Sequence, residues 1–526
     1  MSKLTEMTSY ADAQAHASSA KLWELFDGDR EHLNIAHECM TRWADGSGRA
    51  AVRIAHADGR DEVLSFDRIS AGSAQFAHWL DAQGVAKGER IAFMLEPSLA
   101  FYVCLFGAMQ TGAISVPLFT LFGPDALRLR VNDCTPAILV TNAEKAQLAR
   151  RIADEGGGAM QVVVADDAFL ETLAQHPTSY EPKSAANDVA CYQYTSGTTR
   201  ELPDAVKHSH RSIVTLMYAA LYGTGVRPGD EFFCPSSPAW GHGMWHGTLA
   251  PLALGVTTGT YGEGKFDPVR LMKALDDFGI TNMSAAATHY RMMKNSGKGG
   301  DFTFHFEKLS YTGEPIDPAT LEWIAEYFKV PACSMYGTTE IGVVLVNYPG
   351  ADDFTVKPGS LGKAVPGLEL QVQRGDGTPA DPGEIGELML MRKDGWLSTK
   401  DRAKIDEDGY FYHCGRADDV IISAGWTMSA VEIENTMLRH DAVLECGVIG
   451  VPDEKRGQVV KAFVVSSREG SDELTRELQD FTRERLAQHE FPRLVEYVTE
   501  LPKNPAGKVH RKKLRELEAE RAAVTN

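Results

Sequence analysis

The alternation of short apolar runs with amphipathic segments constrains the fold of this chain more than any other feature. Three runs are typical of buried strands: ERIAFML (89–95), AISVPL (113–118) and AILVTN (137–142). Between the first two, PSLAFYVCLFGAMQTG is typical of a buried helix opened by Pro97 and closed by Gly112. Later segments have a helical period: SIVTLMYAALYG (212–223), RLMKALDDFG (270–279) and TLEWIAEYF (320–328). This alternation predicts parallel sheets with helices on both faces.

A change in pattern divides the chain near residue 417. Beyond it lie two helical and two strand-like segments: VEIENTMLRH (431–440), ECGVIGVP (445–452), VVKAFVVSS (459–467) and ELTRELQDFTRERLAQH (473–489). The junction GRADD (415–419) is polar, as hinges between mobile domains are. We therefore expect a large N-terminal α/β domain, residues 1–416, of parallel-rich sheets flanked by helices, with a β-rich subdomain. A small mobile α+β domain, residues 417–526, follows.

Charge and cysteine content exclude several classes of protein. The 526-residue chain has a formal net charge of −19, which argues against a nucleic-acid-binding surface. Its eight cysteines form no CxxC pair, so neither a zinc site nor a disulfide framework is expected. The N-terminus has no apolar leader, and LAFYVCLFGAM (99–109) is too short to span a bilayer. We expect a cytoplasmic protein without an integral membrane segment; the oligomeric state stays open.

The stretch YTSGTTRELPDAVKHSH (194–210) gathers hydroxyl side chains around one glycine. Backbone N–H groups of a glycine turn, together with Ser and Thr hydroxyls, bind phosphate oxygens. The stretch lies between a strand-like segment, ACYQY, and a helix from Ser212, where ligands bind in α/β sheets. It is not a Walker A loop, and GTYGEGKF (259–266) ends in Phe266 where such a loop needs a hydroxyl. Taken alone, the stretch could equally be an ordinary hydroxyl-rich turn.

Two further stretches carry residues suited to nucleotide binding. In SMYGTTEIG (334–342), Tyr336 could stack on a base and Glu340 could ligate Mg²⁺, or they could be a core residue and a solvated charge. In STKDRAKIDEDGYFYHCGRADDVI (398–421), Asp401 could bind ribose hydroxyls and Arg416 could pair with a phosphate or ribose. The fragment DEDGYF within it is typical of a hairpin turn.

The C-terminal stretch LPKNPAGKVHRKKLRE (501–516) places Lys508 in a short glycine turn. A lysine there could be a mobile cation delivered to a reacting phosphate. For Lys503, Lys512 and Lys513 we favour a basic surface tail.

WGHGMWHG (240–247) carries His242 and His246 at i,i+4 spacing. No HExxH motif exists and the glycines disfavour a helix, so we favour a pocket lining of Trp240, Met244 and Trp245 over a metal site. A Ser–His–Asp triad has no GxSxG turn to start from.

The motifs acquire specificity from their order. YTSGTT, TGEP (312–315), YGTTE, the Asp401 segment, GRADD and PAGK (505–508) follow one another as in the acyl-adenylate-forming superfamily, which this chain strongly resembles from about residue 30 to 516. SPAWGHGMWHGTLAPLALG (237–255) and VPDEKRGQVVKAFVV (451–465) look most like short- and medium-chain acyl-CoA synthetases. The resemblance implies a two-step reaction: a carboxylate attacks the α-phosphorus of ATP, pyrophosphate leaves, the C-terminal domain swings, and the thiol of coenzyme A attacks the acyl-AMP.

The resemblance also implies a role for each matching residue. The β- and γ-phosphates would be held by Thr195, Ser196, Gly197, Thr198 and Thr199. The adenine and its surroundings would be lined by Gly313, Glu314, Pro315, Tyr336, Gly337 and Thr338. Thr339 would contact the α-phosphate, Glu340 would help hold Mg²⁺, and Asp401 would bind the ribose with Arg416 nearby.

Three residues of the C-terminal region complete the set. Lys508 would bridge the carboxylate and the phosphate in the first step, Asp418 would be the hinge, and Gly425 would lie along the pantetheine tunnel. A preplaced cation and Mg²⁺ stabilise the charge that gathers in such a transition state.

The resemblance further implies the size of the acid. In acetyl-CoA synthetases a tryptophan closes the acyl pocket at the position of Gly337, so glycine leaves that space open. The remaining wall would be formed by Trp240, Gly241, His242 and Thr312. A medium-chain, branched, cyclic or aromatic acid is therefore favoured over acetate.

The phosphate loop departs from the family pattern, TSGTTG followed by Pro-Lys. Arg200 replaces the second glycine, Glu201 is an extra residue, and Asp204 stands where lysine is usual. These changes weaken pyrophosphate binding by Coulomb's law unless Arg200 or Lys207 compensates.

Other departures lie in the second half of the chain. Lys400 replaces a glycine before Asp401, Thr427 replaces a basic residue, and Ser429 replaces a glycine. His489, Glu490 and Phe491 replace a Tyr-Lys pair. These changes bear on the CoA-bound conformation more than on adenylation.

We therefore expect an acid:CoA ligase of fatty acid metabolism that uses ATP, Mg²⁺ and coenzyme A and releases AMP and pyrophosphate. Two alternatives stay open: an adenylating enzyme that passes its acyl group to a carrier protein or other acceptor, and a homologue that binds nucleotide or acyl ligand without turnover. GRADD and VPDEKRGQVVKAFVV favour coenzyme A as acceptor. The presence of Lys508, Glu340, Asp401 and Arg416 favours an active enzyme.

Overall fold

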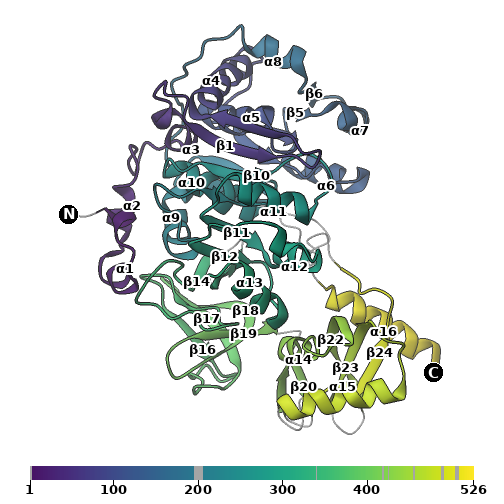
Figure 1. Ribbon diagram of the computed structural model, residues 1–526. Helices are drawn as coiled ribbons and strands as arrows, with labels where there is room; N and C mark the ends of the chain where they lie inside the picture. Colours follow the sequence, from purple (N-terminus) through teal and green to yellow (C-terminus); the bar gives the residue numbers. More distant parts are fainter. Residues whose placement is uncertain are drawn as a thin grey trace. The chain divides into compact units, whose positions relative to one another are not determined.

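The chain forms two compact units in a computed structural model (Figure 1). The structure describes residues 3–194, 205–338, 341–416, 420–423, 426–453, 457–486, 491–503 and 509–525. The first unit comprises Met1–Thr312, Tyr327–Thr355 and Val365–Gly367, and the second Gly313–Glu326, Val356–Ala364 and Leu368–Asn526. The prediction of a mobile domain that begins at residue 417 concerns motion, and it stays a prediction.

The first unit contains a six-stranded sheet in the order β6-β5-β3-β4-β7-β8. Its strands are β3 (Arg90–Met94), β4 (Ile114–Pro117), β5 (Ile138–Thr141), β6 (Gln161–Val164), β7 (Val189–Gln193) and β8 (Val206–Ser209). All neighbours are parallel except β7 and β8. The apolar faces of α6 (Pro124–Cys134) and α7 (Ala143–Glu155) pack on this sheet through side chains such as Leu127 and Ile152.

The buried helix expected between the first two strands is α5 (Leu99–Thr111). The Ser98 hydroxyl accepts a hydrogen bond from the Phe101 N–H at 3.3 Å, which caps its start. Gly112, with φ of 78°, ends it in the left-handed conformation that favours glycine. The predicted end at Gly112 is therefore confirmed, whereas the helix is capped by Ser98 and begins two residues after Pro97.

The strands of a second sheet that belong to this unit follow the order β14-β13-β12-β11-β9-β10-β1-β2. Their bounds are β1 (Ala50–Ala55), β2 (Asp61–Ser65), β9 (Phe232–Phe233), β10 (Thr258–Tyr261), β11 (Asn282–Ala286), β12 (Lys308–Thr312), β13 (Ala332–Thr338) and β14 (Gly342–Val346). The inner strands are parallel, and β2 and β14 are antiparallel. The predicted parallel-rich α/β architecture is confirmed.

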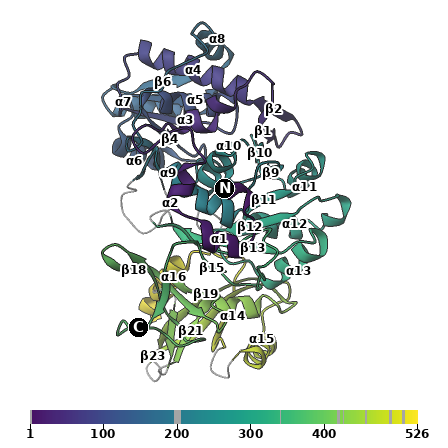
Figure 2. The same cartoon turned by 90° about the vertical axis from the view of Figure 1, so that its left-hand side faces the viewer.

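Helices connect the strands of this sheet (Figure 1). They are α9 (Ser212–Tyr218), η3 (Ala219–Gly223), η4 (His242–Leu249), α10 (Ala250–Ala253), α11 (Pro268–Asp277), α12 (Ala287–Asn295) and α13 (Pro318–Tyr327). Near the N-terminus, α1 (Tyr10–His16) is fixed by Asp353, whose carboxylate accepts hydrogen bonds from the Tyr10 and Ala11 N–H groups at 2.6 and 2.9 Å. Figure 2, turned by 90° from Figure 1, shows the side of the molecule on which α1 lies.

The expectation that glycines prevent a helix around His242 is wrong. Residues His242–Leu249 form the π-helix η4, which includes Gly243 and Gly247. A Cβ at Gly243 would lie 2.2 Å from the Ser237 carbonyl oxygen, and one at Gly247 would lie 2.7 Å from Cys234 Sγ. Because the helix packs so closely on the preceding segment, tertiary contact overrides the low helix propensity of glycine.

The second unit contains three smaller sheets. They are β16-β17-β18-β19, the hairpin β20-β21, and β22-β23-β24. The strands are β16 (Leu370–Gln373), β17 (Gly386–Arg392), β18 (Gly395–Ile405), β19 (Phe411–Arg416), β20 (Val420–Ser423), β21 (Trp426–Ser429), β22 (Val443–Asp453), β23 (Gly457–Ser466) and β24 (Leu494–Tyr497). The turn between β18 and β19 is the hairpin predicted for DEDGYF.

Helices α14 (Ala430–Met437), α15 (Asp472–Arg485) and α16 (Arg511–Thr525) accompany the last of these sheets. Met437, Val448 and Leu478 share one core that includes α14 and α15 side chains, and Leu514 of α16 lies in a second core with Ile449. The α+β character predicted for the C-terminal region is confirmed.

All eight cysteines are buried and none is bridged. Among the described helices, none is both long and apolar enough to cross a membrane.

Candidate functional site

Several of the segments predicted for the first unit lie at the carboxyl ends of parallel strands. Tyr194 follows β7, Thr312 ends β12 and Thr338 ends β13. Strands β12 and β13 are direct neighbours, with Tyr311 opposite Ser334, so their carboxyl ends meet at one edge of the sheet. This is where open α/β sheets bind ligands.

Tyr194 and Gln193 fix the start of the hydroxyl-rich loop. The Tyr194 hydroxyl lies 2.6 Å from Asp133 Oδ2, and its ring is 2% exposed. The Gln193 amide donates a hydrogen bond to the Ala239 carbonyl at 2.6 Å. The start of the loop is therefore tied to the segment that carries Trp240. Sequence reasoning missed Gln193, because a polar residue at a strand end has many possible roles.

The loop residues themselves lie outside the described part of the chain. These are Thr195, Ser196, Gly197, Thr198 and Thr199, with the unusual Arg200, Glu201 and Asp204. Lys207 on β8 lies over the Tyr192 ring at 5.2 Å and lines a cavity of about 260 Å³ together with Arg90 and Asp133. Whether Lys207 compensates for Asp204 stays a prediction.

The YGTTE segment begins on β13 and contains a bulge. The register of β13 and β14 shifts between Tyr336 and Gly337. A Cβ at Gly337 would lie 2.0 Å from the Gly342 carbonyl oxygen. The pairing of β13 with β14 therefore requires glycine at position 337, because the backbone of β14 occupies the place of a Cβ. This requirement does not depend on any acyl group. Thr339 and Glu340 lie outside the described residues.

His242 is held rigidly between two hydroxyls. Its Nδ1 lies 2.9 Å from Ser236 Oγ and its Nε2 lies 2.9 Å from Ser284 Oγ on β11. The Trp240 ring lies 5.4 Å away at a steep angle. Of the predicted acyl-pocket residues, Trp240 and His242 are therefore in ring contact, and Ser236 and Ser284 are partners that sequence reasoning missed.

Burial keeps this group of histidines neutral. It lowers the pKa of His242 well below the ordinary value, and the nearby His246 and His289 lower it further. Burial also lowers the pKa of His246 and of His289 to about 4, with a small opposing effect of the Ala286 backbone on His289. The two rings of His242 and His246 lie 6.0 Å apart. Within the described residues, no three metal-ligating side chains gather at one point.

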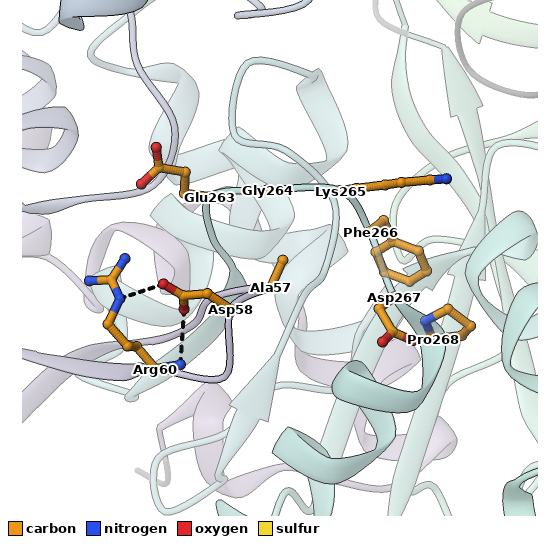
Figure 3. A pocket seen from close by; sticks show the side chains of 9 residues that line it. All are labelled: Ala57, Asp58, Arg60, Glu263, Gly264, Lys265, Phe266, Asp267 and Pro268. Carbon is orange, nitrogen blue, oxygen red and sulfur yellow. Dashed lines mark hydrogen bonds and ion pairs between the residues drawn. The ribbon is translucent and has the colours of Figure 1, made fainter.

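A cavity of about 780 Å³ opens beside this region (Figure 3). One wall is the loop after β10, Glu263–Pro268, and the other is the turn that carries Asp58 and Arg60. Arg60 Nε and Asp58 Oδ2 are 2.6 Å apart. Lys265 extends away from that pair, and the Phe266 ring lies 5.0 Å from the His289 ring. The glycine-rich GTYGEGKF segment thus forms a pocket wall.

In the second unit, Asp401 and Arg416 come together as cross-strand partners. Asp401 on β18 lies opposite Arg416, the last residue of β19. The Asp401 side chain is 5% exposed, and its Oδ1 lies 3.8 Å from His413 Nε2. Gly313, Glu314 and Pro315 follow Thr312 directly and belong to this unit.

Lys400, before Asp401, has φ of 63°. That is the left-handed conformation, which glycine adopts most readily. The backbone conformation at this position therefore explains why glycine is usual there. Ser429 also replaces a glycine, and its hydroxyl accepts a hydrogen bond from the Glu432 N–H at 3.2 Å and caps α14.

Lys508, Asp418 and Gly425 lie outside the described residues. The nearest described residues on either side of Lys508 are bonded to one another. Lys503 and Val509 form an antiparallel bridge, and the His510 N–H donates to the Pro502 carbonyl at 2.7 Å. Lys503 also pairs with Glu445 at 2.7 Å, so it is part of a surface ion pair.

Arg511 anchors the start of α16 to α14. Its guanidinium forms a bidentate pair with the Glu434 carboxylate, which also accepts a hydrogen bond from the Val448 N–H at 2.7 Å. Glu434 is 7% exposed.

Two family models match this chain. The AMP-binding enzyme model matches residues 41–395, and the AMP-binding enzyme C-terminal domain model matches residues 432–508. Acetyl-coenzyme A synthetase of Bacillus subtilis is 29% identical, over 92% of this chain and 90% of that protein. 4-Hydroxybutyrate–CoA ligase 1 of Metallosphaera sedula is also 29% identical, over 88% and 86%. The crystal structure of the anthranilate CoA ligase AuaEII with anthranoyl-AMP is 26% identical, with a TM-score of 0.83 over 95% of this chain and 99% of that one.

Proposed function

This chain belongs to the AMP-binding enzyme family, and we propose that it is an acid:CoA ligase that forms an acyl-CoA through an acyl-AMP. In the first step a carboxylate oxygen bonds to the α-phosphorus of ATP, and the bond to pyrophosphate breaks. In the second step the thiol sulfur of coenzyme A bonds to the acyl carbon, and AMP leaves with the bonding electrons. The chain is an enzyme of the acyl-CoA synthetase class, as its named relatives are.

One observation carries this proposal: both family models occur in a single chain and in the order of a complete adenylating enzyme. The pairing of Asp401 with Arg416 supports it, because a buried carboxylate accepts hydrogen bonds from ribose hydroxyls. Mg²⁺, when bound, neutralises charge on the phosphates.

The other roles are proposed by position. They are triphosphate binding by Thr195–Thr199, adenine contacts by Gly313–Pro315 and Tyr336–Thr338, α-phosphate contact by Thr339 and Mg²⁺ binding by Glu340. Lys508 is proposed for catalysis, with Asp418 as hinge and Gly425 along the pantetheine path.

The acid is proposed to be larger than acetate: medium-chain, branched, cyclic or aromatic. The ring contact between Trp240 and His242 supports a shaped acyl wall in the first unit. The structural relative that holds anthranoyl-AMP handles an aromatic acid. The buried, unbridged thiols suit a reducing compartment such as the cytoplasm.

The test is pyrophosphate release with ATP, Mg²⁺ and a panel of carboxylic acids, each with and without coenzyme A. We expect sustained release that needs both coenzyme A and one class of acid. Release that does not depend on coenzyme A would point to a carrier protein or another acceptor. ATP binding without release for any acid would replace the ligase with a non-catalytic homologue.

A further inference from the structure

We propose that the acid carries a neutral hydrogen-bonding substituent, a hydroxyl or an aromatic amine, which His246 and His289 recognise in the acyl pocket. This inference rests on the proposed function and names its substrate class. It concerns residues of the first unit only.

The pairing of β11 with β12 defines the polar face of the pocket. Ser284 lies opposite Ser310, and Ala286 lies opposite Thr312. Paired residues of parallel strands, and residues two apart, point to the same face of a sheet. Since Ser284 bonds to His242, the side chains of Ser310 and Thr312 face the same layer as that histidine. Hydroxyls and imidazoles therefore line the layer between this sheet and η4. A pocket for a plain alkyl chain would instead be lined by apolar side chains.

Several polar atoms in this region have no hydrogen-bond partner in the protein. They are His246 Nδ1, His289 Nδ1, Trp245 Nε1 and Ser310 Oγ. Ser310 is 0% exposed and Trp245 is 7% exposed. Most buried polar groups in proteins are hydrogen-bonded, because leaving one unpaired is costly. These atoms belong to η4, β12 and α12, which adjoin the predicted acyl wall, and they support a polar ligand there.

His242 itself is not the recognition group. Both of its ring nitrogens already have hydroxyl partners at 2.9 Å, so it serves as a fixed support. His246, 6.0 Å away, and His289, whose ring is backed by Phe266, are half-buried. Their rings are partly exposed although each unpaired Nδ1 is itself buried, so a substituent bonded to Nδ1 would be shielded from water.

The substituent is neutral because the histidines are neutral. With pKa values of about 4, His246 and His289 are uncharged near pH 7, and each imidazole offers one donor and one acceptor. A second carboxylate or an alkylammonium would meet no opposite charge on these rings and would be costly to bury. A hydroxyl or aromatic amine can both donate to and accept from them.

The experiment compares acids of equal shape in the intact enzyme. We would measure kcat/KM for pyrophosphate release with benzoate, its methyl, hydroxy and amino derivatives, and phthalate, together with hexanoate and hydroxyhexanoates. We expect the best hydroxy or amino acid to exceed its methyl counterpart by about tenfold or more, since a site built to bond a polar group rejects analogues that lack it. Equal or better use of the methyl acids, or of phthalate, would overturn the proposal.

Variants then assign the recognition to residues. His246→Leu and His289→Leu should each lower the hydroxy-to-methyl ratio about tenfold, whereas His246→Asn and His289→Asn, which keep a polar atom near Nδ1, should restore part of it. The ratio is measured within one protein sample, so loss of folded enzyme cancels. An unchanged ratio in both leucine variants would assign the preference to other residues and refute these roles.

Failure of the proposed function would give a different result from failure of this inference. If no acid supports turnover, calorimetric titration of the same acid pairs with wild-type protein still tests the preference. Equal affinities there would overturn the inference as well.

Discussion

Lys400 shows how one backbone angle can explain a departure from a family pattern. It holds φ of 63° on β18, directly before the ribose-binding candidate Asp401. A residue with a Cβ is strained there by roughly 1 kcal/mol, and glycine is not.

We expect Lys400→Gly to stabilise the second unit by about 1 kcal/mol, seen as a later midpoint in chemical unfolding. Lys400→Ala is the matched control, because alanine removes the charge and keeps the strain. If both variants unfolded at the same denaturant concentration, charge would explain the effect and the backbone would not.

Two explanations for the glycine at position 337 can be distinguished by a substitution. The resemblance assigns it to the acyl pocket, whereas the 2.0 Å approach of the Gly342 carbonyl requires glycine for strand pairing. We expect Gly337→Ala to destabilise the protein by about 1–3 kcal/mol and to lower kcat/KM for small and large acids alike. Gly342→Ala is the control: it meets nothing within 4 Å but has φ of 75°. A loss confined to large acids would favour the pocket explanation.

At the scale of elements, strands and helices with a regular spacing of apolar residues were predictable from the sequence. The close packing between them was not predictable. The end of α5 at Gly112 could be predicted because a local residue type determines it. The π-helix η4 could not, since its glycines are explained only by a neighbouring segment that is absent from any local window. For the same reason Ser284 and His289, far from Trp240 in sequence, gave no signal.

A bidentate ion pair between Glu434 and Arg511 links α14 to α16. We expect Glu434→Gln to destabilise the second unit by about 3–5 kcal/mol, because it removes the negative charge that faces the largely buried Arg511 guanidinium. Adding Arg511→Met should recover part of the loss, measured as a double-mutant cycle in chemical unfolding. Strict additivity would contradict a direct coupling.

The buried histidines give the first unit a pH-dependent stability. Burial lowers the pKa of His208, His210, His246 and His289 to about 4, whereas the unfolded chain titrates near 6.5. Unfolding therefore takes up protons between these values, so stability is full above about pH 6.5 and falls as the pH drops towards 4. Chemical unfolding at several pH values measures this, and His289→Leu should flatten the slope. A midpoint independent of pH would contradict buried neutral rings.

At the scale of the whole molecule, the order of motifs predicted the family and the fold class, because a complete adenylating enzyme needs all of them in one chain. The details of the site were less accessible. Asp401 and Arg416 were expected near each other and are cross-strand partners. The roles of Thr195–Thr199, Glu340 and Lys508 depend on residues outside the described part of the chain, and they stay predictions.

Lys508→Ala tests whether Lys508 is needed for adenylation and not for thioester formation. We expect it to lower acid-dependent adenylation by at least about a hundredfold, since it removes a cation from a site where negative charge develops. Thioester formation from supplied acyl-AMP should continue. Lys503→Ala, which removes a surface ion pair with Glu445, is the matched control. Unimpaired adenylation in the Lys508 variant would contradict the mechanism.

The burial of the native cysteines has a practical consequence for measuring motion of the two units during turnover. Burial raises the pKa of thiols such as Cys104, Cys234 and Cys446, so they are protonated and shielded from alkylating reagents. A single cysteine introduced on the surface of each unit would therefore accept a fluorophore without removal of any native thiol. The natural sequence is already suited to energy-transfer measurements that would follow the two units through the catalytic cycle.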